Sequence, residues 1–166
     1  MRVLGIDPGV ATTGYGVVER AGNRLRAEGA GVIRTTPRTG QAQRLLELRV
    51  ALGGIISSYG PDAVAVERVF FNNNVRTAMA VGQASGIALL CAAEAAVEVA
   101  DYTPSEVKRS VAGFGSASKR QVQAMVAALL SLERAPAPAD AADACALAIC
   151  HLNRAGLARA LGEAAS

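Results

Sequence analysis

Apolar runs near the start of the chain predict three strands that form an antiparallel meander. Residues 2–6 are mainly apolar, which is typical of a buried strand, and the turn signal Asp7-Pro8-Gly9 follows them. Residues 14–19 and 25–34 predict a second and a third strand. Because Gly22-Asn23 between them favours a hairpin turn, we expect these two strands to be antiparallel neighbours.

The pattern then changes to helical spacing. Apolar residues recur three and four positions apart from Leu45 to Tyr59, and Gly60-Pro61 ends this helix. A strand follows over 62–67, and because a helix joins it to the first strand, a right-handed crossover makes the two strands parallel. The rest of the chain predicts a long helix over 74–95, a strand over 97–100, helices that begin at the capping boxes Thr103–Glu106 and Ser118–Gln121, and a last helix over about 139–155.

These elements predict one α/β domain. Its sheet is mixed and five-stranded, with an antiparallel meander of three strands beside two parallel strands, and helices flank it. A chain of 166 residues is long enough to bury a real core in one domain. We expect that single domain to cover residues 1–158 and a flexible C-terminal tail to cover residues 159–166.

Composition predicts a cytoplasmic protein without a membrane partner. No run of roughly 18 uninterrupted apolar residues occurs, so we expect no transmembrane helix. The first residues form a strand pattern and lack the apolar core and cleavage site of a signal peptide. Cys91, Cys145 and Cys150 form no CxxC pair and are odd in number, which favours reduced, buried thiols.

The charge balance permits a nucleic-acid partner without requiring one. The chain carries 17 basic and 14 acidic residues, a net charge of +3. Its two lysines, Lys108 and Lys119, are each followed by an arginine and lie in or near the first turn of a predicted helix. One interpretation is chance combined with coding bias. The other is that these positions require a compact ammonium near phosphate.

Four carboxylates are predicted to meet in this fold. Asp7 and Glu67 end the two parallel strands, whose carboxyl ends lie at the same edge of the sheet. Asp140 and Asp143 lie three residues apart at the start of the last helix and share one face of it. Acids this close repel each other unless a cation joins them, and hard oxygen ligands favour Mg²⁺ or Mn²⁺.

Each acid alone has an ordinary explanation, since acids at strand ends and helix starts often form only salt bridges or helix caps. The combination fits a site that holds two metal ions for phosphoryl transfer. In that chemistry one ion activates the attacking water and the other stabilises the leaving 3′ oxygen, while a lysine neutralises charge in the transition state.

Two further features leave alternatives open. Phe70 and Phe71 follow Glu67 in a turn-like segment; a loop Phe is ordinarily buried in its own domain, but this pair could instead stack on unpaired bases. Gly82 and Gly86 lie on one face of the long helix. Glycine weakens a helix by about 1 kcal/mol, which close packing within the chain or against a second copy would offset.

Short motifs along the chain, taken in order, are similar to those of one nuclease family. They are Leu4-Gly5-Ile6-Asp7-Pro8-Gly9, Thr13-Gly14-Tyr15-Gly16, Glu67-Arg68-Val69-Phe70, Gly82-Gln83-Ala84, Tyr102-Thr103-Pro104 with Val107-Lys108, Gly113-Phe114-Gly115-Ser116-Ala117 with Lys119, Val122-Gln123, and Ala139-Asp140-Ala141-Ala142-Asp143-Ala144. From residue 3 to about 151 the chain resembles the RuvC family of Holliday-junction resolvases. The resemblance implies a ribonuclease H-like fold.

The resemblance also implies an activity. Such enzymes are homodimeric, Mg²⁺-dependent endonucleases that bind four-way junction DNA and nick two strands symmetrically in recombination and repair. Two ions per site are implied, with Mn²⁺ able to replace Mg²⁺, and RuvA and RuvB are the implied protein partners.

The same resemblance assigns roles to residues. The catalytic and metal-binding carboxylates are Asp7, Glu67, Asp140 and Asp143, and Lys119 assists catalysis. The resemblance assigns DNA contacts to Phe70, Lys108 and Lys119, and we expect further DNA contacts at Phe71, Arg68, Arg76 and Arg120. The expected dimer contacts on the helix over 74–95 are Met79, Gly82, Gly86 and Leu90.

Two alternatives to the resolvase are a junction-binding dimer without catalysis and a YqgF-like nuclease of the same fold. The chain departs from the family pattern at Arg68, where Gln is familiar, at Phe71, which doubles the aromatic, and at Cys145, where an aliphatic residue is usual. His151 lies about 12 Å along the last helix from Asp143, so we expect an ordinary surface or partly buried histidine that does not reach the acids.

Overall fold

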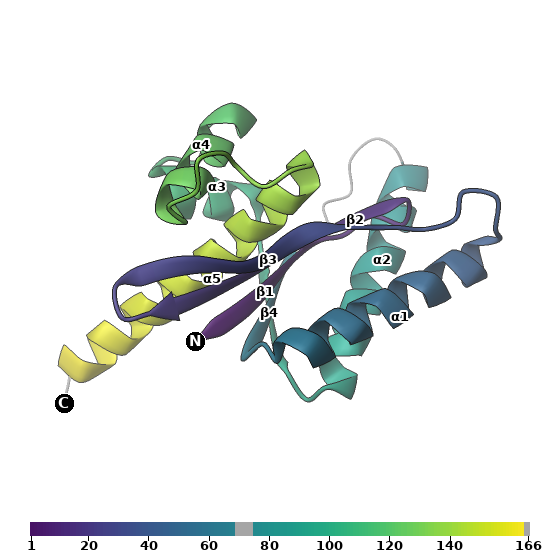
Figure 1. Cartoon of the computed structure of the whole chain (residues 1–166), viewed down its shortest axis with the longest axis horizontal. Coiled ribbons are helices and arrows are strands. Elements are labelled where there is room, and N and C mark those ends of the chain that lie inside the picture. Colours follow the sequence, from purple (N-terminus) through teal and green to yellow (C-terminus); the bar gives the residue numbers. More distant parts are fainter. Residues whose placement is uncertain (69–74, 165–166) are drawn as a thin grey trace.

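A mixed five-stranded sheet forms the centre of the molecule (Figure 1). The computed structural model describes residues 1–68 and 75–164. The elements along the chain are β1 (Arg2–Asp7), β2 (Thr12–Ala21), β3 (Arg24–Arg34), α1 (Gln41–Tyr59), β4 (Ala63–Glu67), α2 (Val75–Glu94), β5 (Glu98–Tyr102), α3 (Pro104–Ala112), α4 (Lys119–Leu129) and α5 (Ala139–Ala164).

The strands follow the predicted topology. Their order across the sheet is β3-β2-β1-β4-β5. The strand β2 pairs antiparallel with both β1 and β3, whereas β4 is parallel to β1 and β5 is parallel to β4. The predicted meander and the two parallel strands are therefore confirmed. The carboxyl ends of the neighbouring strands β1 and β4 lie side by side, at the same end of the sheet.

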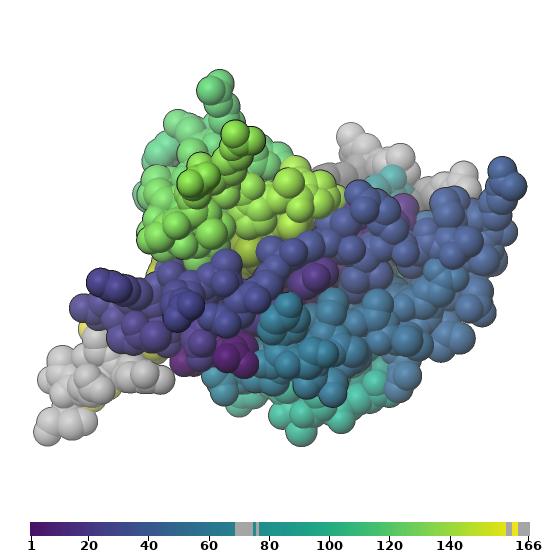
Figure 2. Space-filling model, in the orientation of Figure 1, coloured from purple at the N-terminus to yellow at the C-terminus, as the bar shows by residue number. Residues whose placement is uncertain are grey.

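Helices cover both faces of the sheet (Figure 1). The helix α5 lies along one face with α3 and α4 beside it, and Ile149 belongs to this core. The helices α1 and α2 pack together on the other face, where Leu52 is buried. Figure 2 shows the β2–β3 hairpin as a ridge between α1 and the α4–α5 side. Cys91, Cys145 and Cys150 are free and buried, as predicted.

Glycines allow α5 to lie unusually close to the sheet. A Cβ atom on Gly5 of β1 would lie 1.9 Å from the carbonyl oxygen of Ala144. A Cβ atom on Gly14 of β2 would lie 2.1 Å from the carbonyl oxygen of Asp140. No side chain fits in either gap, so the first turns of α5 rest directly on the sheet, where β1 ends.

The last helix is longer than predicted. It continues to Ala164, whereas the sequence pattern predicted an end at about residue 155. Gly156 and Gly162 lower the helix propensity of this stretch, which explains the early predicted end. The division into a domain over 1–158 and a flexible tail over 159–166 stays a prediction.

The helix α2 presents an apolar surface that the described part of the chain leaves largely uncovered. Its segment Thr77–Glu94 has a mean hydropathy of 1.2, and 28% of it is buried, so its length and composition would allow it to cross a membrane. The sequence criterion missed it because that criterion required an uninterrupted apolar run. One such helix is weak evidence, since helices of soluble proteins pass the same test, and the expected lack of a membrane partner stays a prediction.

Candidate active site

Three carboxylates meet where α5 crosses the end of β1. Asp7 is the last residue of β1 and pairs with Gly14 of β2, on which the backbone of Asp140 rests. Asp143 follows one turn later in α5. Oxygen atoms of Asp7, Asp140 and Asp143 all lie within 4.8 Å of one another. Because Gly14 has no side chain, Asp140 and Asp143 of α5 can approach Asp7 at the end of β1.

The turn after Asp7 is held by a buried hydroxyl. Thr13 is 1% exposed, and its Oγ1 donates a hydrogen bond to the carbonyl oxygen of Gly9. The same oxygen accepts a hydrogen bond of 3.3 Å from the Gly9 backbone N–H. This reciprocal pair closes the β1–β2 connection and limits the movement of Asp7.

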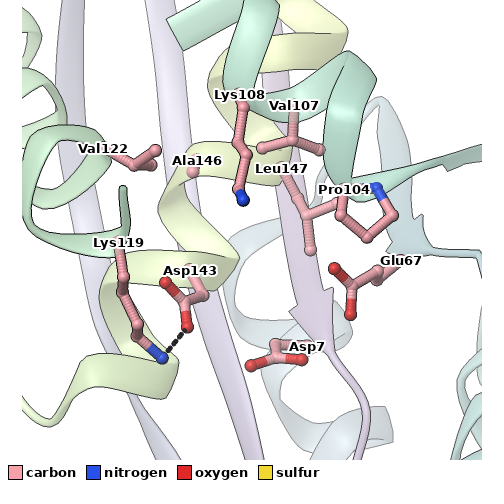
Figure 3. A pocket seen from close by; sticks show the side chains of 10 residues that line it. All are labelled: Asp7, Glu67, Pro104, Val107, Lys108, Lys119, Val122, Asp143, Ala146 and Leu147. Atoms are coloured by element: carbon pink, nitrogen blue, oxygen red, sulfur yellow. Dashed lines mark ion pairs between the residues drawn. The ribbon is translucent and has the colours of Figure 1, made fainter. Parts of the chain in front are cut away.

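Glu67 completes one wall of the site without joining the three-acid cluster. It ends β4, lines a pocket of about 240 Å³ together with Asp7 and Asp143, and its carboxylate faces Asp7 (Figure 3). The residues that line this pocket are Asp7, Glu67, Pro104, Val107, Lys108, Lys119, Val122, Asp143, Ala146 and Leu147. The structure thus gathers three of the four predicted acids tightly and places the fourth beside them.

Burial and repulsion between the acids oppose the ionisation of Asp7 and Glu67. Burial and the neighbouring charges of Glu67, Asp143 and Asp140 raise the pKa of Asp7 from 3.8 to about 7, although Lys119 acts in the opposite direction. Burial, followed by the charge of Asp143, also raises the pKa of Glu67. Such a cluster of partly buried acids is stabilised by any cation that enters it.

Both lysines of the chain reach the pocket. Lys119 begins α4 just after Ser118, which forms a capping box with Gln121, and its Nζ lies 2.6 Å from Oδ2 of Asp143 (Figure 3). This hydrogen bond raises the pKa of the Lys119 ammonium. Lys108 extends from α3 into the same pocket. The capped starts of the helices therefore place the two cations that the sequence analysis singled out.

Arg68 and Arg120 are predicted DNA contacts whose side chains the structure describes, and neither lines the pocket. Arg68 is exposed and forms an ion pair of 2.5 Å between its Nε and Oδ2 of Asp101 on β5. Arg120 is exposed next to Lys119 but does not line the pocket. Phe70 and Phe71 lie outside the described residues. Arg76 lies in the first turn of α2, and its side chain is also outside the described part.

His151 lies apart from the acids, as predicted. Its Nδ1 and the Tyr102 hydroxyl form a hydrogen bond of 2.8 Å. Burial lowers the pKa of His151, and the guanidinium of Arg154 lies 5.8 Å from the centre of the Tyr102 ring. The histidine is half-buried and joins α5 to β5, which is a structural role.

The predicted dimer residues lie on the outer surface of α2. Met79 is 60% exposed and Leu90 is 47% exposed. The Cβ positions of Gly82 and Gly86 meet nothing within 4 Å in the described chain. Packing within the chain therefore does not explain these glycines, which leaves the alternative of a second copy.

Sequence analysis missed the apolar wall of the pocket. Val107 and Pro104 of α3, Val122 of α4 and Leu147 of α5 form this wall (Figure 3). No local signal in the sequence shows that three separate helices turn these side chains toward the acids. The capping boxes marked where α3 and α4 begin, but not where these helices lie relative to each other.

The fold and the site define the class of protein: a ribonuclease H-like α/β protein whose acidic cluster is suited to divalent cations. Residues 3–151 match the family "Crossover junction endodeoxyribonuclease RuvC". The chain belongs to the RuvC family, which confirms the predicted membership.

Individual relatives agree with this assignment over nearly the whole chain. The RuvC protein of Heliobacterium modesticaldum is 54% identical over 150 residues, 90% of this chain and 93% of that protein. The RuvC protein of Pelotomaculum thermopropionicum is 52% identical over 153 residues, 92% of this chain and 93% of that protein. The structure of Thermus thermophilus RuvC in complex with Holliday junction substrate is similar with a TM-score of 0.90 at 37% identity, covering 95% of this chain and 96% of that one.

Proposed function

We propose that this protein is a crossover junction endodeoxyribonuclease, which resolves four-way DNA junctions by metal-dependent hydrolysis of two symmetry-related phosphodiesters. The observation that carries the proposal is the cluster of Asp7, Asp140 and Asp143 at the sheet edge of a RuvC-family chain. A YqgF-like nuclease loses support because the matched family is RuvC. The complete set of acids gives no support to a junction-binding protein without catalysis.

The residues at the site fit Mg²⁺ or Mn²⁺. Carboxylate oxygens are the ligands that these hard cations prefer, and burial together with the neighbouring acids raises the pKa of Asp7, which a bound cation would counteract. Asp7, Asp140 and Asp143 would hold such an ion, with Glu67 available to a second one. When bound, the ions supply an activated water and stabilise the leaving 3′ oxygen.

The side chains of the protein have distinct tasks around the scissile phosphate. Lys108 and Lys119 offer two ammonium groups at the pocket, where they bind the phosphodiester and offset the negative charge that develops on it. The apolar wall around Val107 and Leu147 limits access of bulk water and strengthens these electrostatic contacts. Further proposed DNA contacts are Arg68, Arg120, Arg76, Phe70 and Phe71.

Two copies of the chain are proposed to act together. A twofold-symmetric dimer presents two equivalent sites to two equivalent strands of a junction. The exposed apolar surface of α2, with open space at Gly82 and Gly86, supplies a self-complementary face for it. RuvA and RuvB remain the proposed protein partners, and the cytoplasm the proposed compartment.

Cleavage of a synthetic four-way junction tests this function. We expect the protein with Mg²⁺ or Mn²⁺ to produce paired, symmetrically placed nicks with ends that DNA ligase seals. Asp7→Asn should reduce the cleavage rate at least about 100-fold, because it removes a central carboxylate, while junction binding stays measurable. Glu133→Gln, a change at an exposed acid that does not line the pocket, is the matched control.

Two outcomes would contradict the proposal. Normal cleavage by Asp7→Asn would show that the acidic cluster is not the active site. Junction binding by the unaltered protein without cleavage at any Mg²⁺ or Mn²⁺ concentration would instead favour the non-catalytic junction-binding dimer.

A further inference from the structure

Lys119 occupies a position that is unfavourable for its own helix. It is the first residue of α4, Arg120 follows it, and no acidic residue lies in that first turn. The partial positive charge of a helix N-terminus disfavours cations there. The charge of Lys119 is therefore balanced by another part of the molecule, namely the acidic cluster.

The contact that balances Lys119 uses a carboxylate of the cluster, that of Asp143. Its Nζ lies 2.6 Å from Oδ2 of Asp143, which is a short, charge-assisted hydrogen bond. The charges of Asp140 and Asp7 also act on this ammonium. One positive charge of the protein thus lies directly against a carboxylate that belongs to the three-acid cluster.

The second lysine provides a natural comparison. Lys108 lines the same pocket, and its charge lowers the pKa of Glu67, but among the described residues it forms no ion pair of 4.0 Å or less. The two lysines therefore contribute the same charge to the same pocket, and they differ in whether the ammonium contacts a carboxylate.

We infer that Lys119 is a built-in competitor of the divalent cation, so that a cation binds at Asp143 only as the ammonium leaves it. The inference rests on the proposed metal site. A cation and an ammonium that both bind the Asp143 carboxylate share its single negative charge, and the two positive charges repel each other. The competitor offsets one negative charge of the acidic cluster and weakens metal binding, and its release provides an ammonium for the DNA phosphate.

Chemical labelling of the unaltered protein tests the release. Lys108 and Lys119 are the two lysines of the chain, so acylation by a succinimidyl ester followed by peptide mass spectrometry reports each one separately. We expect Mn²⁺ alone to increase labelling of Lys119 relative to Lys108, because an ammonium freed from Asp143 reacts more readily. An unchanged or smaller ratio at saturating Mn²⁺ would overturn the inference.

Calorimetric titration with Mn²⁺ tests the competition itself. Lys119→Met keeps an aliphatic side chain but removes the charge, and we expect it to bind Mn²⁺ about fivefold more tightly or better than the unaltered protein. Lys108→Met removes the same charge from the same pocket at a lysine without an ion pair to the cluster, so its gain in Mn²⁺ affinity at the same ionic strength should be smaller than that of Lys119→Met.

The outcomes separate this inference from the proposed function. Equal Mn²⁺ affinity of Lys119→Met and the unaltered protein would overturn the competition and leave the metal site intact. Absence of Mn²⁺ binding to every variant would overturn the metal site and the competition together. If Lys119→Met does not fold, the labelling ratio of the unaltered protein decides the question.

Discussion

At the scale of single residues, the surroundings of Asp7 raise the pKa of its carboxyl group and so oppose its ionisation. Burial, Glu67 and the two acids of α5 raise its pKa from 3.8 to about 7. A carboxyl with a raised pKa in the folded state binds its proton more tightly there than in the unfolded chain. Its contribution therefore favours folding at low pH and is lost progressively as the pH rises from about 4 to about 7.

Asp7→Asn removes this penalty. We expect the variant to be more stable than the unaltered protein above pH 7 by at most about 4 kcal/mol, which is the free-energy equivalent of the pKa change, and to differ little at pH 4. Urea unfolding at both pH values, in the presence of a chelator, measures the difference. Glu133→Gln is the control, and a stability gain of Asp7→Asn that is the same at both pH values would contradict the explanation.

At the scale of elements, the contact between α5 and the sheet positions the site. Gly5 and Gly14 leave room for the backbone of the helix, and any side chain at either position would meet backbone atoms that have no space to move. The cluster depends on this approach, since Asp140 rests on Gly14 opposite Asp7. The geometry of the active site therefore depends on the two glycines, Gly5 and Gly14, as well as on the acids.

Gly5→Ala tests this packing. The new methyl group would lie 1.9 Å from the carbonyl oxygen of Ala144, so we expect a loss of about 3 kcal/mol in the free energy of unfolding. Gly54→Ala, in α1 with nothing within 4 Å of its Cβ position, should instead stabilise by up to about 1 kcal/mol. Chemical denaturation measures both, and equal effects of the two changes would contradict the close contact.

Elements could be predicted from the sequence where the signal lies in neighbouring residues. The capping boxes at Thr103 and Ser118 mark the starts of α3 and α4, and both are present in the structure. The parallel crossover correctly placed Asp7 and Glu67 at one edge of the sheet.

Contacts between distant segments could not be predicted in the same way. Nothing near Gly14 in the sequence indicates that Asp140 lies on it, and the ion pair between Arg68 and Asp101 joins residues on separate elements. Glu67 was expected within the tight cluster, but it lies beside it. The distance between two strand ends depends on side-chain geometry that the strand pattern does not contain.

At the scale of the whole molecule, the exposed face of α2 is the main feature that a single chain leaves unexplained. Met79, Leu89 and Leu90 are each 47% exposed or more. Large apolar surfaces of this kind mark interaction sites. A second copy packed on this face would bury it and would relate two acidic clusters by a twofold axis.

Met79→Glu tests the dimer. A buried, unpaired carboxylate at the centre of an apolar interface strongly opposes association, so we expect the variant to have the mass of one chain in light scattering, and the unaltered protein to have twice that mass. Leu46→Glu, at a 49% exposed leucine of α1, should remain a dimer. A dimer that survives Met79→Glu with undiminished affinity would place the interface elsewhere.

The central claim is that Asp7, Asp140 and Asp143, with Glu67 beside them, form a divalent cation site. Anomalous X-ray diffraction from crystals of the protein soaked in Mn²⁺ tests it most directly. The account predicts an anomalous peak at the sheet edge within coordination distance of at least two of the clustered carboxylates, with Lys119 displaced from Asp143. Anomalous density confined to other parts of the surface at saturating Mn²⁺ would contradict it.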